Sequence, residues 1–158
     1  MKYFTKNWHE SIQKTIVYRS SEVEKQIEKA EYDYQDHYKK FEPFFPECVK
    51  KFNNDDFNMH DCLIICIDFI GKGFCMEIDS SSGFCDVDKL TFVNAQILEM
   101  DGCLNGGTWL YDEVYLHQGR KDRYEMHILF HAYSEEPELG EMIIVFDKII
   151  IEGNWAQE

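Results

Sequence analysis

The residues best suited to chemistry lie in the stretch 107–133, where carboxylates, imidazoles and aromatic rings occupy alternate positions. A carboxylate beside an imidazole can support proton transfer, and sets of His and Glu can hold zinc or iron. Alternation is typical of a β-strand, whose successive side chains point to opposite faces. One face therefore collects the candidate binding residues, which are Trp109, Tyr111, Glu113, Tyr115, Glu125, His127 and His131.

The same stretch predicts a β-hairpin with its turn near Arg120. Its apolar residues then share the other, buried face, with Asp112 as the one exception; they are Leu110, Val114, Leu116, Tyr124, Met126, Ile128 and Phe130. The predicted register pairs Tyr115 with Glu125, Glu113 with His127, Tyr111 with Leu129, and Trp109 with His131. A shift of one residue would drive Glu125 and His127 into the core, so that register is disfavoured.

The face that carries Glu113 and His127 has three possible uses. The simplest is structural, with the two residues forming a cross-strand ion pair beneath packed helices. The second is binding of a protein or a ligand, and the third is catalysis or metal binding. His127 and His131 lie about 13 Å apart along a strand, which excludes a simple two-histidine metal site.

A second motif, Asn58-Met59-His60-Asp61-Cys62-Leu63-Ile64-Ile65-Cys66, begins another predicted strand. His60, Cys62 and Cys66 should share one face, with the two sulfurs about 13 Å apart, too far for a disulfide or for one metal. We interpret His60-Asp61 as a hydrogen-bonded turn that leads into the strand. A catalytic couple of Cys62 and His60 is the alternative, although nothing marks an orienting residue for it.

The chain has six cysteines, at positions 48, 62, 66, 75, 85 and 103. None forms a Cys-x-x-Cys pair, so a structural zinc site has little support. We expect reduced, mostly buried thiols, with no metal and no cofactor.

The elements that position these motifs fall into two parts. Trp8, Ile12 and Ile16 fall four residues apart and predict a short helix, and a longer apolar stripe predicts a helix of about 20 residues. The second helix should begin at a capping box formed by Ser21 and Glu24 and end at Glu42-Pro43. Pro46 then opens a final short helix through Lys51, and residues 53–56 form the boundary with the second part.

The second part reads as strands, near 60–70, 73–79, 89–100, 107–117, 122–133 and 141–152. No helix-length segment lies between them, so the sheet should be antiparallel. The predicted fold class is α+β, with a helical N-terminal unit packed on a curved antiparallel sheet of about six strands. We expect one domain over 1–158, with a helical part at 1–52 and a β part at 58–153.

The formal net charge is −14, and it is unevenly distributed. Residues 1–52 carry ten Lys/Arg and nine Asp/Glu, whereas residues 53–158 carry six and twenty-one, a balance of 6 − 21 = −15. Such a charge repels nucleic acid and anionic membranes and fits a basic protein partner or simple solubility. The sequence shows no signal peptide and no membrane span, so we expect a cytoplasmic protein.

Several motifs resemble a bacterial family of short cytoplasmic proteins of unknown function. They are the opening Met1 to Lys6, the His60-Asp61 turn, Trp109-Leu110-Tyr111-Asp112-Glu113 and Tyr124-Glu125-Met126-His127. The resemblance spans nearly the whole chain and implies bacterial origin, but no reaction.

The sequence favours a non-enzymatic, acidic intracellular binding protein, for example an immunity-type protein that neutralises a basic toxin. One alternative is a metal-dependent or acid–base hydrolase that uses Glu113, Glu125, His127 and His60. Another is a small-ligand binder with a pocket between the helices and the sheet.

Overall fold

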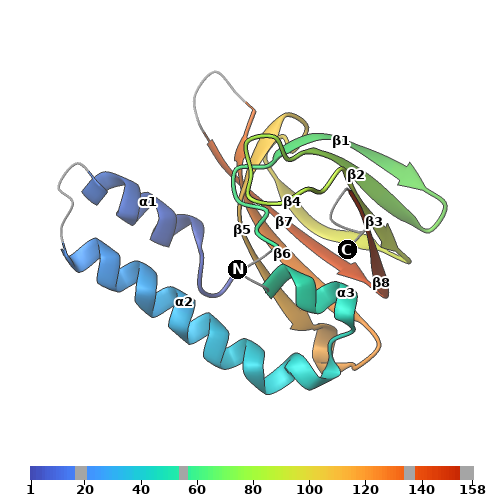
Figure 1. Cartoon of the computed structure of the whole chain (residues 1–158), viewed down its shortest axis with the longest axis horizontal. Helices are drawn as coiled ribbons and strands as arrows, with labels where there is room; N and C mark the ends of the chain where they lie inside the picture. Colours follow the sequence, from blue (N-terminus) through green and yellow to red (C-terminus); the bar gives the residue numbers. More distant parts are fainter. Residues whose placement is uncertain (17–20, 54–56, 134–137, 154–158) are drawn as a thin grey trace.

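The helical part follows the predicted pattern closely. The computed structural model describes residues 1–16, 21–53, 57–133 and 138–153, and the helices pack beside the sheet (Figure 1). They are α1 (Lys6–Ile16), α2 (Ser21–Phe41), η1 (Glu42–Phe44), α3 (Glu47–Lys50) and η2 (Lys51–Asn53). The proline after Glu42 ends α2, as expected. The rest of the predicted boundary, residues 54–56, lies outside the described residues, and none of the described helices is long and apolar enough to cross a membrane.

The β part forms one antiparallel sheet of eight strands, in the order β4-β7-β6-β5-β1-β2-β3-β8. The strands are β1 (Leu63–Ile70), β2 (Gly73–Asp79), β3 (Lys89–Val93), β4 (Gln96–Asp101), β5 (Gly107–Leu116), β6 (Tyr124–Ala132), β7 (Glu138–Phe146) and β8 (Lys148–Glu152). The fold class is therefore α+β, as predicted, but the sheet is larger than the expected six strands.

The two additional strands arise because two predicted segments are each divided in two. The 89–100 segment becomes β3 and β4, and the 141–152 segment becomes β7 and β8. The same two segments pair with each other twice, β3 with β8 and β4 with β7. They thus form a bent ribbon that curves the sheet, and sequence periodicity gave no signal for the bends at Asn94 and Asp147.

The β5–β6 hairpin confirms most of the predicted register. Tyr115 lies opposite Glu125, Glu113 opposite His127, and Tyr111 opposite Leu129. The predicted pair of Trp109 with His131 was wrong, because an irregularity between Trp109 and Tyr111 shifts the register by one residue. A bulge adds one residue to one strand and exchanges the faces that follow it. Trp109 therefore lies opposite Phe130, fully buried in the core.

A second bulge corrects the predicted faces of β1. The register shifts between Ile64 and Cys66, so Cys66 lies opposite the exposed Glu77 and Ile67 lies opposite the buried Met76. Cys62 and Ile64 stay buried, whereas Cys66 turns to the other face. The prediction from alternation alone, that Cys62 and Cys66 share one face, was therefore wrong.

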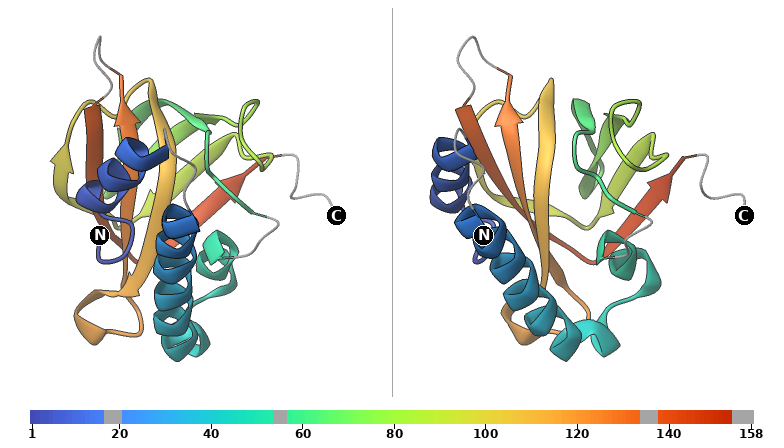
Figure 2. Two further views of the ribbon diagram at one scale, coloured as in Figure 1. Left: turned by 90° about the vertical axis from the view of Figure 1, so that its left-hand side faces the viewer. Right: turned by 60° about the vertical axis from the view of Figure 1, so that its left-hand side comes forward.

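The helices cover an edge that the sheet leaves open. β1 pairs with β5 only at Leu63–Ile64 and Gly107–Thr108, so the rest of that edge of β5 has no strand partner. The backbone N–H of Val114 donates instead to the Tyr34 hydroxyl of α2, at 2.9 Å. Figure 2 shows α2 running beside β5 in both views. An exposed strand edge is costly to leave unpaired, and the Tyr34 hydroxyl of α2 satisfies the Val114 N–H on this edge.

The buried face of the hairpin makes a prediction about stability. Ile128 is fully buried at the centre of β6, so Ile128→Ala should lower the free energy of unfolding by about 2–5 kcal/mol. Urea unfolding measures the change. Ile150→Ala, at a position that is 40% exposed in β8, is the matched control and should cost much less. Equal losses for both variants would contradict the burial assigned to Ile128.

Candidate functional site

The predicted binding face is held beneath the N-terminal segment through Glu113. Its carboxylate is fully buried, and its oxygens accept backbone N–H groups from Lys2 at 2.8 Å, Tyr3 at 2.8 Å and Phe4 at 2.7 Å. The Tyr115 hydroxyl donates a further hydrogen bond to the same carboxylate. A buried charge is stable only when it is well hydrogen-bonded, and these four donors meet that requirement.

A second carboxylate, Glu125, lies between two histidines on the same face. It contacts the ring nitrogens Nδ1 of His117, at 2.7 Å, and Nε2 of His127, at 2.6 Å. Burial by itself would raise the pKa of Glu125, but the hydrogen bonds with His127 and His117 outweigh it and lower the pKa. The carboxylate therefore stays charged, and its hydrogen bonds fix the orientations of the His117 and His127 rings.

Aromatic rings fill the remainder of this face. Tyr111 stacks on Phe4 with 5.1 Å between ring centroids and meets the Trp8 ring edge-on at 5.4 Å. His9 of α1 lies 5.6 Å from His131 of β6. The segment 1–9 and α1 thus cover the face by ring contacts as well as by hydrogen bonds.

The structure brings six of the seven candidate binding residues together on this covered face. They are Tyr111, Glu113, Tyr115, Glu125, His127 and His131. Trp109 lies on the opposite face, because the bulge between Trp109 and Tyr111 reverses the alternation. Glu113 is fully buried and His127 is 7% exposed; Glu113 binds the N-terminal segment, whereas His127 contacts Glu125 and Tyr115 of the sheet.

The turn at His60 and Asp61 also has the predicted structural role. The His60 backbone N–H donates to the Asn58 side chain at 2.9 Å, and His60 Nδ1 lies 3.2 Å from Asp61 Oδ2. Asp61 has φ 68°, in the left-handed region that a short polar side chain tolerates, and its N–H donates to the Trp109 carbonyl at 2.9 Å. These bonds fix the turn that leads into β1.

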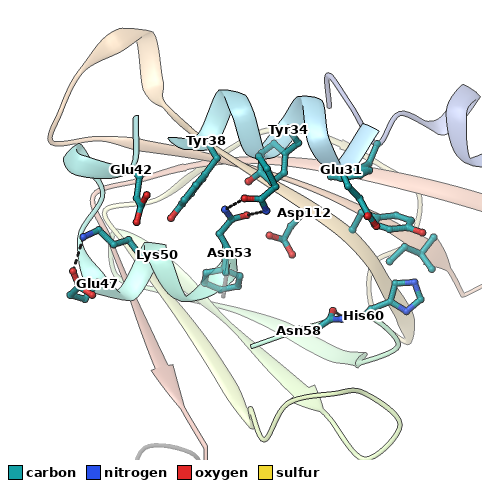
Figure 3. Close-up of a pocket in the computed structure, with 15 residues that line it drawn as sticks. Glu31, Tyr34, Tyr38, Glu42, Glu47, Lys50, Asn53, Asn58, His60 and Asp112 are labelled. Carbon is teal, nitrogen blue, oxygen red and sulfur yellow. Dashed lines mark hydrogen bonds and ion pairs between the residues drawn. The ribbon is translucent and has the colours of Figure 1, made fainter. Parts of the chain in front are cut away.

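A groove of about 1070 Å³ lies where α2 and α3 approach the open edge of β5. Its polar lining comes from α2 (Glu31, Tyr34, Gln35, Tyr38), from the short helices that follow (Glu42, Glu47, Lys50, Asn53), from the turn before β1 (Asn58, His60) and from β5 (Asp112). Figure 3 shows these side chains around the groove, with Gln35 and Asn53 joined by two hydrogen bonds of 3.3 Å.

Asp112 is the most unusual group in the groove. Its Oδ1 accepts a hydrogen bond from Trp109 Nε1 at 3.1 Å. Burial raises the pKa of Asp112 to about 7; the Trp109 hydrogen bond opposes this shift, and the neighbouring Glu113 adds to it. A carboxyl group with a strongly raised pKa in a groove is a candidate for a functional role.

Two tyrosines of α2 line the groove beside Asp112. The Tyr34 hydroxyl accepts the Val114 N–H and keeps its own hydrogen free to donate. The Tyr38 side chain is 4% exposed, and its hydroxyl has no hydrogen-bond partner within the described part of the chain. Buried hydroxyls nearly always have a partner, so the Tyr38 hydroxyl is available to a ligand or to water.

The groove has an excess of negative charge. Glu31, Glu42, Glu47 and Asp112 line it, whereas Lys50 is the only Lys or Arg among its described lining residues. Lys50 Nζ lies 2.8 Å from Glu47 Oε1, which neutralises it locally. Lys50 also interacts electrostatically with Glu42, so the negative excess of the groove lies mainly at Glu31 and Asp112.

Asp112 was visible in the sequence as the one polar residue in an apolar alternation. Its importance was missed because the cavity is made by α2 and α3, whose contacts with β5 are remote in sequence. The groove lies between the helices and the sheet, and Tyr111 is the one predicted binding-face residue in its described lining; His60, named for the hydrolase alternative, also lines it.

Metal ligation has one geometric candidate in the described part of the chain. Cys66, Asp68 and Glu77 each offer one ligand atom, and these atoms lie within 4.8 Å of one another. Cys66 is only partly buried and both carboxylates are exposed. Desolvation and the neighbouring Glu77 and Asp68 raise the pKa of Cys66, which disfavours the thiolate that a metal requires. This cluster therefore carries no metal assignment.

Comparisons with known proteins point to one family. The family described as "Protein of unknown function (DUF4085)" matches residues 3–138. No curated protein and no solved structure gives a significant match to the chain.

The four hydrogen bonds to the Glu113 carboxylate should stabilise the fold. Glu113→Gln replaces a carboxylate oxygen with an NH2 group that faces N–H donors, so it should lower the free energy of unfolding by about 1.5–3 kcal/mol. Urea unfolding measures the loss. Glu99→Gln, at an exposed position of β4, makes the same chemical change and should have little effect. If both variants unfold at the same urea concentration, the hydrogen bonds to Glu113 do not stabilise the fold.

The raised pKa of Asp112 makes a prediction about pH dependence. The folded state holds this proton up to about pH 7, whereas the unfolded chain releases it near the ordinary value of 3.8. The stabilising contribution of the group is therefore fully present below that value and is lost as pH rises through 7. Asp112→Asn removes this titration, so the variant should gain stability relative to the native chain between about pH 5 and pH 8.

Unfolding of both chains in urea at the two pH values measures the effect. Asp68→Asn, at an exposed site in β1, is the control and should show no relative gain. Parallel stability profiles for the native chain and Asp112→Asn would contradict the assigned pKa.

Proposed function

The chain belongs to the DUF4085 family of proteins of unknown function, and we propose that it is a non-enzymatic, acidic binding protein that receives a basic protein partner in the groove between α2 and β5. The observation that carries the proposal is that Asp112 and the Tyr38 hydroxyl, which has no hydrogen-bond partner among the described residues, line one groove that has a negative excess. The Tyr38 side chain is buried, whereas Asp112 is partly buried and accepts one hydrogen bond, from the Trp109 indole N–H.

The chemistry of the lining favours a guanidinium group as the part of the partner that enters. Arginine presents a planar array of five N–H donors that matches carboxylates and stacks on aromatic rings. Asp112 and Glu31 supply acceptors, and Tyr34 and Tyr38 supply rings and hydroxyls. A guanidinium between them would also stabilise the charged form of Asp112 and lower its pKa.

The charge of the whole β part supports a basic partner at longer range. The balance of −15 over residues 53–158, which include the β part, would attract a cationic protein and accelerate encounter, in a manner that salt screens over about 8 Å at physiological ionic strength. The form of this function that we propose is an immunity-type protein of the bacterial cytoplasm, which covers the basic active site of a toxin.

A second candidate function is acid–base catalysis, and the pKa of Asp112 near 7 specifically favours it. A general acid or base works best when its pKa is close to the working pH. The catalytic group of this alternative is Asp112 and not Glu113, because the oxygens of Glu113 are already engaged by four protein donors.

The binding proposal is tested by NMR titration with a short neutral peptide that contains one arginine. The Trp109 indole N–H donates to Asp112, and the Val114 amide N–H donates to Tyr34. The NMR signals of these two groups therefore report on residues that line the groove. Both signals should shift on addition of the arginine peptide and should not shift with the same peptide containing citrulline, which keeps the shape and removes the charge. Asp112→Asn and Tyr38→Phe should weaken binding, whereas Glu99→Gln, away from the groove, should not.

The native chain and Asp112→Asn then serve as paired baits in host lysate at low and high salt. A basic protein retained only by the native chain, and only at low salt, supports the proposal. An equal response to both peptides, or equal binding by Asp112→Asn, overturns it. Turnover in a broad hydrolase screen that disappears in Asp112→Asn would favour the acid–base alternative.

A further inference from the structure

Two cysteine sulfurs that do not line the groove lie in contact with each other. Cys62 lies just before β1, and Cys85 lies in the loop between β2 and β3. Their Sγ atoms are 3.6 Å apart, and Cys85 Sγ is also 3.6 Å from Met59 Sδ. All six cysteines of the chain are free in this structure, and the contact joins residues that are 23 positions apart.

The loop fits closely over the Cys62 sulfur. Gly83 lies so near that a Cβ at its position would collide with Cys62 Sγ. The neighbouring Phe84 forms an isolated antiparallel bridge with Asn58. Glycine thus permits the close approach, and the bridge anchors the loop, so the sulfur contact belongs to the fold.

The two thiols differ in their access to solvent. Cys62 is fully buried, whereas Cys85 is half-buried and follows Phe84, which is 67% exposed. An oxidant in solution can therefore reach Cys85 first. Cys62 lies behind it, within reach of any product formed on the Cys85 sulfur.

The hydrogen bond between the two sulfurs also shifts the pKa values of the two thiols in opposite directions. The hydrogen bond with Cys62, aided by the backbone of Val87, lowers the pKa of Cys85. The same contact and burial raise the pKa of Cys62. The thiolate is the nucleophilic form of cysteine, and this form is favoured at the accessible member of the pair.

We propose that Cys85 and Cys62 form a site of reversible oxidation, in which Cys85 reacts with hydrogen peroxide and Cys62 resolves the product as an intramolecular disulfide. This arrangement of an accessible thiol beside a resolving thiol is typical of redox-sensitive cysteines. The site is independent of the proposed binding function, since neither sulfur lines the groove.

The chemistry balances in two steps. In the first, the Cys85 thiolate attacks one peroxide oxygen, so an S–O bond forms, the O–O bond breaks, and hydroxide leaves. In the second, the Cys62 sulfur attacks the sulfenic sulfur, so an S–S bond forms and the S–O bond breaks. The departing oxygen leaves as water with the Cys62 proton. The two thiols lose two electrons, and the peroxide is reduced to two molecules of water. The sulfurs must approach from 3.6 Å to about 2.05 Å, a movement that the loop between β2 and β3 would supply.

The test exposes the folded full-length chain to equimolar hydrogen peroxide, blocks the remaining thiols with an alkylating agent, and maps the peptides by mass spectrometry. The expected product is one peptide pair that links Cys62 to Cys85, and a dithiol reductant should reverse it. Cys62→Ala should abolish the link and leave Cys85 as a sulfenic acid that dimedone traps. Cys85→Ser should lose both products, and Cys103→Ser, at the exposed cysteine, should change neither.

Circular dichroism and unfolding curves confirm that each variant is folded before oxidation. If Cys62→Ala is not folded, Cys62→Ser takes its place. The proposal is overturned if peroxide modifies Cys103 while Cys62 and Cys85 remain free thiols. It is also overturned if dimedone labels Cys85 to the same extent in the native chain and in Cys62→Ala.

Discussion

The burial of the Glu113 carboxylate is the constraint on which the arrangement of helices and sheet depends. A charge at a fully buried position is stable only when its oxygens are satisfied, and three of its four donors are backbone N–H groups of residues 2–4. The sheet therefore cannot bury Glu113 unless the N-terminal segment is in place. The segment in turn carries Phe4 and leads into α1, whose rings cover the rest of the same face.

Asp112, the neighbour of Glu113 on β5, has fewer hydrogen-bond donors than Glu113. Asp112 and Glu113 are adjacent on β5 and point to opposite faces, as strand geometry requires. Glu113 has four donors, whereas Asp112 has the single indole N–H of Trp109. Part of the burial cost of Asp112 consequently remains and appears as a pKa near 7. The same strand thus provides a carboxylate with four donors on one face and a carboxylate with a raised pKa on the other.

The groove at Asp112 results from the way the sheet opens. β1 departs from β5 after two paired positions, and α2 and α3 cover the resulting gap without filling it. Tyr34 satisfies the Val114 N–H of the open edge, and Tyr38 brings into the space a hydroxyl that has no partner among the described residues. The features that make the groove a candidate site are therefore consequences of an incompletely paired edge covered by an aromatic helix face.

The sequence by itself determined the α+β class, the limits of α2, the antiparallel pairing of the strands and the pairing of Glu113 with His127, because these follow from local periodicity and proline placement. Only the tertiary structure decided which face Trp109 and Cys66 occupy, since a bulge reverses the alternation without a composition signal. It also decided that the long segments bend into eight strands, that residues 2–4 occupy the oxygens of Glu113, and that Asp112 lines a groove. These outcomes depend on contacts between segments remote in sequence, and the cost of burying a charge is set by such contacts and not by the neighbouring residues alone.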